Sequence, residues 1–270
     1  MNQLAGREHP MDFNPINDDH AIQLVSFKVA CDRIIEPLDL QAIAQSHGRV
    51  RSELPAISGS EQPMPTLELA YLRPDGTASW LLRCGGNEIT VECRRYTRWV
   101  KIWRTAQKLL LFAMNEVGAS GQIKFGQPSL QFTDRFKGVK GEESDLGGLL
   151  CRSDVLAGIA FRKGPLFHSN IGYFEGARGT LILHHVNVQG RKDAFLQLPS
   201  GAQEEGYYVV LDHTQYVRGP SDFLTAADSE GYLGQVMPVM HENNKNMLLD
   251  VLVPAMTARI GLQRVAEDVK

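Results

Sequence analysis

Residues 67–96 read LELAYLRPDGTASWLLRCGGNEITVECRRY, and this stretch decides the predicted fold. It holds three strand-like runs, LELAYLR, TASWLLRC and EITVECRRY, rich in residues that favour extended backbone. Residues 74–76 (PDG) and 85–87 (GGN) separate the runs, and these residue types tolerate the left-handed backbone of tight hairpin turns. The stretch therefore predicts an antiparallel meander of three strands.

The chain before the meander has three predicted parts after a polar, mobile N-terminus at residues 1–20. Residues 22–31 (IQLVSFKVAC) alternate apolar and polar side chains, which predicts a half-buried strand. A short helix is expected from Pro37 to about Gly48, because proline is tolerated in a first helical turn. Residues 55–65 (PAISGSEQPMP) are predicted to be a loop, since they hold three prolines with glycine and serine.

The chain after the meander changes to a helical period from Arg98, and Gly118 ends the predicted helix. Its apolar face is formed by Trp99, Trp103, Ala106, Leu110, Met114 and Val117. Further strand-like runs follow, and a long amphipathic helix through Tyr232–Val251 closes the chain. Pro238 could kink that helix or mark its start.

The predicted fold class is α+β, with two strand-rich halves at residues 21–118 and 119–270. Each half is expected to run strand, short helix, antiparallel meander and helix, so that helices cover antiparallel sheets. This arrangement argues against a doubly wound parallel sheet and against the nucleotide enzymes built on one.

Composition limits the classes of protein that fit. The 270 residues are 43% apolar and 22% charged, which excludes a disordered or coiled-coil chain. The formal net charge of −3 does not attract polyanions over the whole surface, so any nucleic-acid site must be a local patch. We expect no membrane segment or signal peptide and a cytoplasmic location. The scattered cysteines predict buried thiols and neither disulfides nor a zinc site: Cys31, Cys84, Cys93 and Cys151.

Enzyme signatures are absent from the sequence. No GxGxxG, GxxxxGK[ST], GxSxG or HExxH motif occurs, so we expect no catalytic residues, cofactor or metal. His184 and His185 are adjacent, and on a strand they point to opposite faces, where they cannot share a metal. A dispersed enzyme or small-ligand site stays open as an alternative, drawn from His184, His185, Asp212, His213 and His241.

The most distinctive segment interleaves cations and large aromatics where a strand meets a helix. Its basic residues are Arg94, Arg95, Arg98, Lys101, Arg104 and Lys108. Such mixtures bind nucleic acid, with cations on phosphates and rings on unpaired bases. The helical projection places Trp99 and Trp103 inward and the cations outward, so a basic solvated face above a core anchor is the simpler interpretation.

Two motifs resemble a sporadically distributed bacterial family of uncharacterised proteins of about this length. They are residues 96–99 (YTRW) entering a helix with Trp103, and the final helix with residues 240–242 (MHE) and 254–257 (PAMT). The resemblance implies no activity and transfers no catalytic residue. The patchy occurrence of that family implies a defence or toxin–antitoxin type of gene cassette.

Three functional hypotheses follow. The first is a non-enzymatic interaction protein, such as an accessory, antitoxin or immunity-like component with a protein partner. The second is RNA or DNA binding through the basic segment, and the third is the dispersed enzyme or ligand site. A homodimer is also expected from the final helix, although core packing explains its methionine stripe equally well: Met237, Met240, Met247 and Met256.

Overall fold

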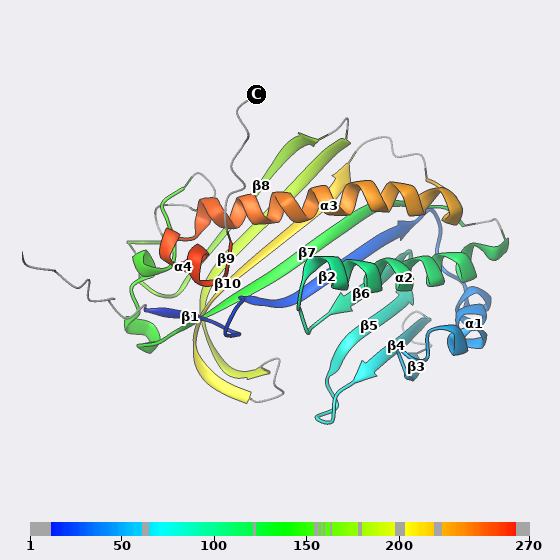
Figure 1. The fold of residues 1–270 in the computed structure, drawn as a ribbon, viewed down its shortest axis with the longest axis horizontal. Helices are drawn as coiled ribbons and strands as arrows, with labels where there is room; N and C mark the ends of the chain where they lie inside the picture. The colour runs from blue at the N-terminus through cyan, green and yellow to red at the C-terminus, as the bar shows by residue number, and fades with distance from the viewer. Residues whose placement is uncertain are drawn as a thin grey trace, which may run out of the picture.

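The computed structural model describes these residues: 12–60, 65–120, 123–153, 156, 158, 160–162, 164–177, 180–197, 203–218 and 223–262. They form one ten-stranded antiparallel sheet with helices packed on it (Figure 1). The strands are β1 (Phe13–Pro15), β2 (Ile22–Cys31), β3 (Ala56–Ser60), β4 (Thr66–Leu72), β5 (Ala78–Gly85), β6 (Glu88–Cys93), β7 (Phe125–Gly138), β8 (Phe167–Ala177), β9 (Thr180–Gln197) and β10 (Gln203–Arg218).

The α-helices are α1 (Pro37–Gln45), α2 (Trp99–Val117), α3 (Ala226–Val251) and α4 (Pro254–Arg259). Short 3₁₀ turns occur at His47–Arg49, Gly118–Ser120, Gly141–Glu143 and Leu146–Gly148. The helix of the first half ends where Gly118 was expected to end it, and α3 runs through Pro238. The side chain of Thr225 caps α3 by accepting from the Asp228 amide.

The two halves of the chain have similar strand connectivity. The strand order is β3-β4-β5-β6-β2-β7-β10-β9-β8, with β1 paired to β7. The first long strand of each half, β2 or β7, therefore lies at the centre, and the last strand of the same half pairs beside it. The expected α+β class, the antiparallel pairing and the similar element order of the halves are confirmed.

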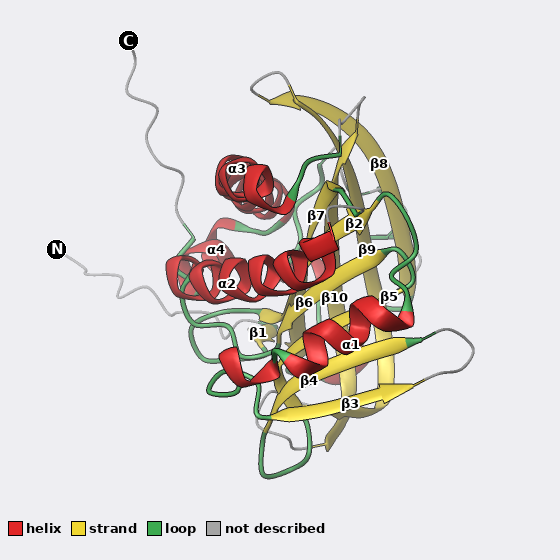
Figure 2. Ribbon diagram, turned by 90° about the vertical axis from the view of Figure 1, so that its right-hand side faces the viewer, coloured by secondary structure: helices red, strands yellow, loops and turns green. Residues whose placement is uncertain are grey.

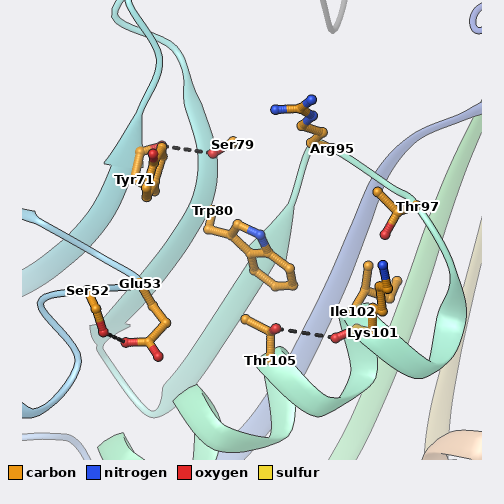
Figure 3. A pocket seen from close by; sticks show the side chains of 10 residues that line it. All are labelled: Ser52, Glu53, Tyr71, Ser79, Trp80, Arg95, Thr97, Lys101, Ile102 and Thr105. Carbon is orange, nitrogen blue, oxygen red and sulfur yellow. Dashed lines mark hydrogen bonds between the residues drawn. The ribbon is translucent and has the colours of Figure 1, made fainter.

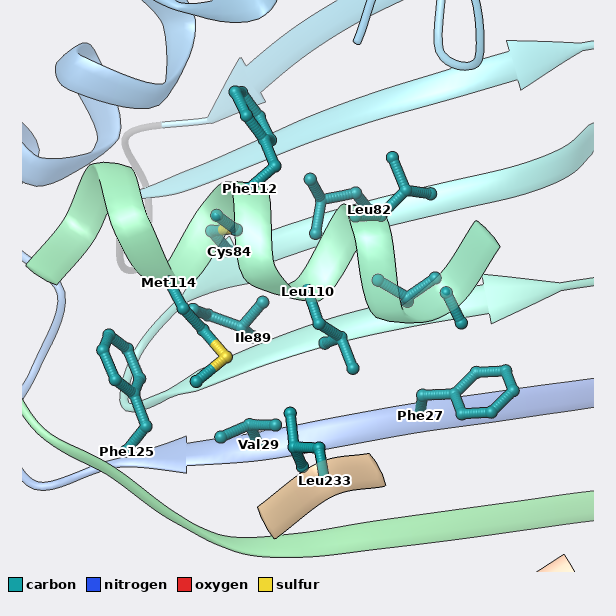
Figure 4. Close-up of a cluster of buried hydrophobic side chains, with 14 of the residues drawn as sticks. Phe27, Val29, Leu82, Cys84, Ile89, Leu110, Phe112, Met114, Phe125 and Leu233 are labelled. Carbon is teal, nitrogen blue, oxygen red and sulfur yellow. The ribbon is translucent and has the colours of Figure 1, made fainter. Parts of the chain in front are cut away.

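The four α-helices found among the described residues lie on one face of the sheet (Figure 2). In the first core, apolar side chains of α2 pack on alternate residues of β2, β5 and β6, including Phe27, Leu82 and Leu110 (Figure 4). A second core lies under the C-terminal part of α3 and α4. None of the described helices covers the opposite face, which we call the open face.

The predicted meander is β4, β5 and β6, and both turns contain a glycine with positive φ, Gly76 at 80° and Gly86 at 59°. The loop predicted for residues 55–65 is wrong at 56–60. These residues form edge strand β3, because Ala56–Ser60 pair with β4 despite the flanking prolines.

Burial accounts for two of the sequence signals. The four methionines of the stripe are at most 3% exposed, so they pack in the core and leave no apolar surface for a partner copy. The four cysteines are free, and Cys31, Cys84 and Cys93 are buried as predicted, whereas Cys151 is only partly buried. Burial raises the pKa of Cys31 to about 12 and that of Cys93 to about 11. Among the described residues, no helix combines the length and apolar character needed to span a membrane.

Candidate functional site

The basic segment lies at the N-terminal end of α2, directly after β6. Trp99 and Trp103 stack on each other with ring centroids 6.1 Å apart, and both rings pack against Phe27 of β2. Arg98, Lys101, Arg104 and Lys108 are exposed on the other side of the helix. The predicted separation of tryptophans and cations is therefore confirmed.

Two of the six cations are neutralised by ion pairs. Arg94 Nη2 lies 3.0 Å from Glu92 Oε2, and Lys108 pairs with Glu53. The hydrogen bond from Lys108 also lowers the pKa of Glu53. Arg95, Arg98, Lys101 and Arg104 have no ion-pair partner among the described residues. The local excess of positive charge is therefore held by these four side chains.

A groove of about 390 Å³ opens beside these cations, between α2, the ends of β4 and β5 and the loop before β3 (Figure 3). Its walls combine aromatic, hydroxyl and cationic side chains, and Glu53 is its one acidic group among the described residues. We call it the α2 groove, and it is lined by Ser52, Glu53, Tyr71, Ser79, Trp80, Arg95, Thr97, Lys101, Ile102 and Thr105.

The hairpin register brings the aromatic residues to this groove. In the β5–β6 pair Trp80 lies opposite Cys93, one residue before the basic segment begins, and Tyr71 lies opposite Trp80 in the β4–β5 pair. Figure 3 shows the Trp80 indole projecting from β5 toward α2, with Arg95 beside it. Tyr71 is 47% exposed, so its ring is available to a ligand.

Sequence reasoning missed Trp80 and Tyr71, because they lie 14 or more residues before Arg94. A signal was present nonetheless. Once the turn at residues 85–87 sets the register, counting back along both strands places Trp80 across from Cys93.

The field of the helix adds to the charge of the groove. α2 has no acidic residue in its first turn, and its N-cap, Arg98, makes no side-chain capping bond. The N-terminus of a helix carries partial positive charge, so it adds to the cations instead of offsetting them. The groove therefore suits an anion that also presents a flat ring.

The five residues of the alternative polar set lie at three places. His184 and His213 are buried together under α3, where His184 Nδ1 lies 3.1 Å from His213 Nε2. His185 is exposed, and Asp212 accepts a 2.6 Å hydrogen bond from Thr133; both lie on the open face. His241 stacks on Trp99 with centroids 4.2 Å apart.

Burial makes the histidines of the helix-covered face poor bases. It lowers the pKa of His184 to about 4 and that of His213 to about 3. Burial is likewise the main cause that lowers the pKa of His241 to about 4. All three rings are therefore neutral at pH 7. Asn244, which is hydrogen-bonded to His213, and Glu175, which lies 3.3 Å from His184, were not among the predicted site residues.

No group of three or more His, Cys, Asp or Glu side chains in the described part of the chain is arranged to hold a metal ion. No family model matches the chain, and no curated protein matches it.

Proposed function

We propose that this protein binds single-stranded nucleic acid, with the α2 groove holding one nucleotide of the strand. The observation that carries the proposal is the meeting of Arg95 and Lys101 with Trp80 and Tyr71 in one groove. Cations hold phosphates, and aromatic side chains stack on unpaired bases with little regard to sequence. The volume of about 390 Å³ lies within the range of small-ligand pockets.

A single strand fits better than a duplex. Stacking on an aromatic side chain needs a base that is free of its partner, and the bases of a duplex are paired and stacked on one another. Arg98 and Arg104 lie on the exposed side of α2 and extend the positive surface beyond the groove. A strand leaving the groove along α2 therefore keeps cations beside its phosphates.

The test is fluorescence anisotropy with labelled oligothymidylate and oligouridylate between about 50 and about 200 mM NaCl. Binding is expected to weaken with salt, with a slope of about 0.7 in log K against log salt for each phosphate contact. Arg95→Gln and Lys101→Gln should each weaken binding and reduce that slope by about 0.7. Tyr71→Ala should weaken binding about tenfold, since stacking on one ring is worth about 1–3 kcal/mol.

The matched control is Lys192→Gln on β9. Lys192 pairs with Glu142 and lies in the other half of the sheet, so the variant removes the same charge away from the groove. Equal binding by Arg95→Gln, Lys101→Gln and Lys192→Gln would contradict the proposal. So would the absence of binding at the lowest salt concentration.

A second candidate is the interaction function, with a second copy of this chain as partner. The observation in its favour is the outer edge of β8, which pairs with no strand beyond β9 among the described residues and lies beside the exposed side chains of Phe174 and Leu181. Light scattering at micromolar concentration should give twice the monomer mass, and Phe174→Ser should return it to the monomer. A monomeric wild-type chain removes this candidate. The cassette context implied by the family resemblance stays a prediction.

A further inference from the structure

A second cavity, of about 520 Å³, lies between β8 and α3, away from the α2 groove. We call it the β8–α3 pocket. Ile171, Tyr173 and Glu175 line it from the sheet, since alternate residues of a strand share a face. Asn243, Met247 and Asp250 line it from α3, where residues spaced by three, four or seven share a face.

The pocket is amphipathic. Ile171 and Met247 are apolar, whereas Glu175, Asp250 and Asn243 supply carboxylate and carboxamide groups. Together with burial, the charges of Glu175 and Asp250 raise the pKa of Tyr173, so its phenol is neutral at pH 7. The lining therefore suits a ligand with a short apolar body and a positively charged head.

Behind the pocket runs a chain of buried polar side chains. His213 Nδ1 lies 2.9 Å from Asn244 Oδ1, and His213 Nε2 lies 3.1 Å from His184 Nδ1. All three side chains belong to residues at most 2% exposed. The ring of Tyr173 stacks on His184 at 4.6 Å, which joins this chain to the wall of the pocket.

The positions of the protons follow from Asn244. Its Oδ1 can only accept, so His213 Nδ1 carries the proton and donates it. The neutral His213 then has a lone pair on Nε2, which accepts from His184 Nδ1. His184 is neutral as well, so its Nε2 has a lone pair and no proton.

That lone pair has no hydrogen-bond donor in the described part of the chain. His184 Nε2 is buried there without a hydrogen-bond partner, and it lies 3.3 Å from Glu175 Oε2. Two acceptors facing each other at this distance repel unless a donor lies between or beside them. Glu175 is 53% exposed and lines the pocket, so its side chain can move to admit such a donor.

We infer that the β8–α3 pocket binds a small primary amine in its ammonium form. The ammonium group donates to Glu175 and to His184 Nε2, and the alkyl body packs against Ile171, Tyr173 and Met247. An ammonium has three donors, which matches a carboxylate on the pocket wall and a lone pair 3.3 Å behind it. The inference is independent of nucleic-acid binding at the α2 groove.

Calorimetric titration of the full chain at pH 7 with n-pentylamine and with 1-pentanol tests the charged head. The two probes share one alkyl body, so pentylamine should bind at least about tenfold more tightly, as expected for one charge-assisted hydrogen bond. Glu175→Gln should remove that advantage. Glu230→Gln removes the same charge from an exposed site near the start of α3 and should leave it intact.

Equal affinity of the wild-type protein for pentylamine and pentanol overturns the inference. So does an equal preference for pentylamine in the Glu175→Gln and Glu230→Gln variants. Nitrogen-15 spectra of the free protein give a further check on the proton positions. They should place the His184 proton on Nδ1, and a proton on Nε2 instead would remove the vacant acceptor and with it the inference.

Discussion

Asp134 is a buried carboxyl group whose replacement should raise stability at neutral pH and above. It lies on β7 between Phe132 and Phe136, on the face covered by the helices, and is 2% exposed. Burial, and secondly the charge of Asp212, raise the pKa of its carboxyl from 3.8 to about 7. Burial, and secondly the charge of Asp134, raise the pKa of Tyr96 to about 12.

The sign of the pH dependence follows from that direction. The folded protein keeps a proton on Asp134 up to about pH 7, whereas the unfolded chain loses it near pH 4. The contribution of Asp134 to stability is therefore lost as the pH rises from about 4 to about 7. A pKa raised from 3.8 to about 7 corresponds to about 4 kcal/mol.

Asp134→Asn keeps the shape of the side chain and cannot ionise. The variant should gain up to about 4 kcal/mol over the wild type at pH 8, and little at pH 4, since the wild-type carboxyl is protonated there. Urea unfolding followed by circular dichroism at several pH values gives the difference between the two proteins. Taking the difference cancels the histidine contributions that both proteins share.

Asp212→Asn serves as the partial control. It removes the smaller cause of the raised pKa and leaves the burial of Asp134, so its effect on the pH profile should be smaller. The reasoning is refuted if Asp134→Asn and the wild type differ by the same free energy at pH 4 and pH 8.

Two further predictions concern stability. Gly190→Ala should be strongly destabilising, because a Cβ there would lie 2.0 Å from the Pro165 carbonyl oxygen. Gly172→Ala is the control: the nearest atom to its Cβ would be 3.7 Å away, so the free energy of unfolding should fall by about 1 kcal/mol or less. The thermal unfolding midpoints of the two variants check this. Acidification from pH 6.5 to pH 4 should lower the urea midpoint of unfolding. In the unfolded chain His184 and His213 take up protons near pH 6.5, whereas in the folded protein burial lowers their pKa values to about 4 and about 3. A urea midpoint that rises over this pH range would contradict the prediction.

Local pattern was sufficient where neighbours in sequence set the structure. The turns at residues 74–76 and 85–87 fixed two hairpins, and glycines with positive φ occupy both. The helical period from Arg98 placed Trp99 inward and Lys101 outward, as the structure has them. Strand alternation separated His184 from His185, since consecutive side chains point to opposite faces.

Only the tertiary structure joined residues that are distant along the chain. The pairing of β2 with β7 merges two halves into one sheet, and no local period contains that information. The α2 groove forms only where Tyr71 and Trp80 line the same opening as Arg95. The buried series of hydrogen-bonded side chains likewise needs Asn244 of α3 to lie against His213 of β10. The sequence by itself determined which faces of the helices and strands are apolar, because the spacing of apolar residues matches the period of each element. Only the tertiary structure decided which of these faces pack together, because contacts between distant residues depend on the whole chain.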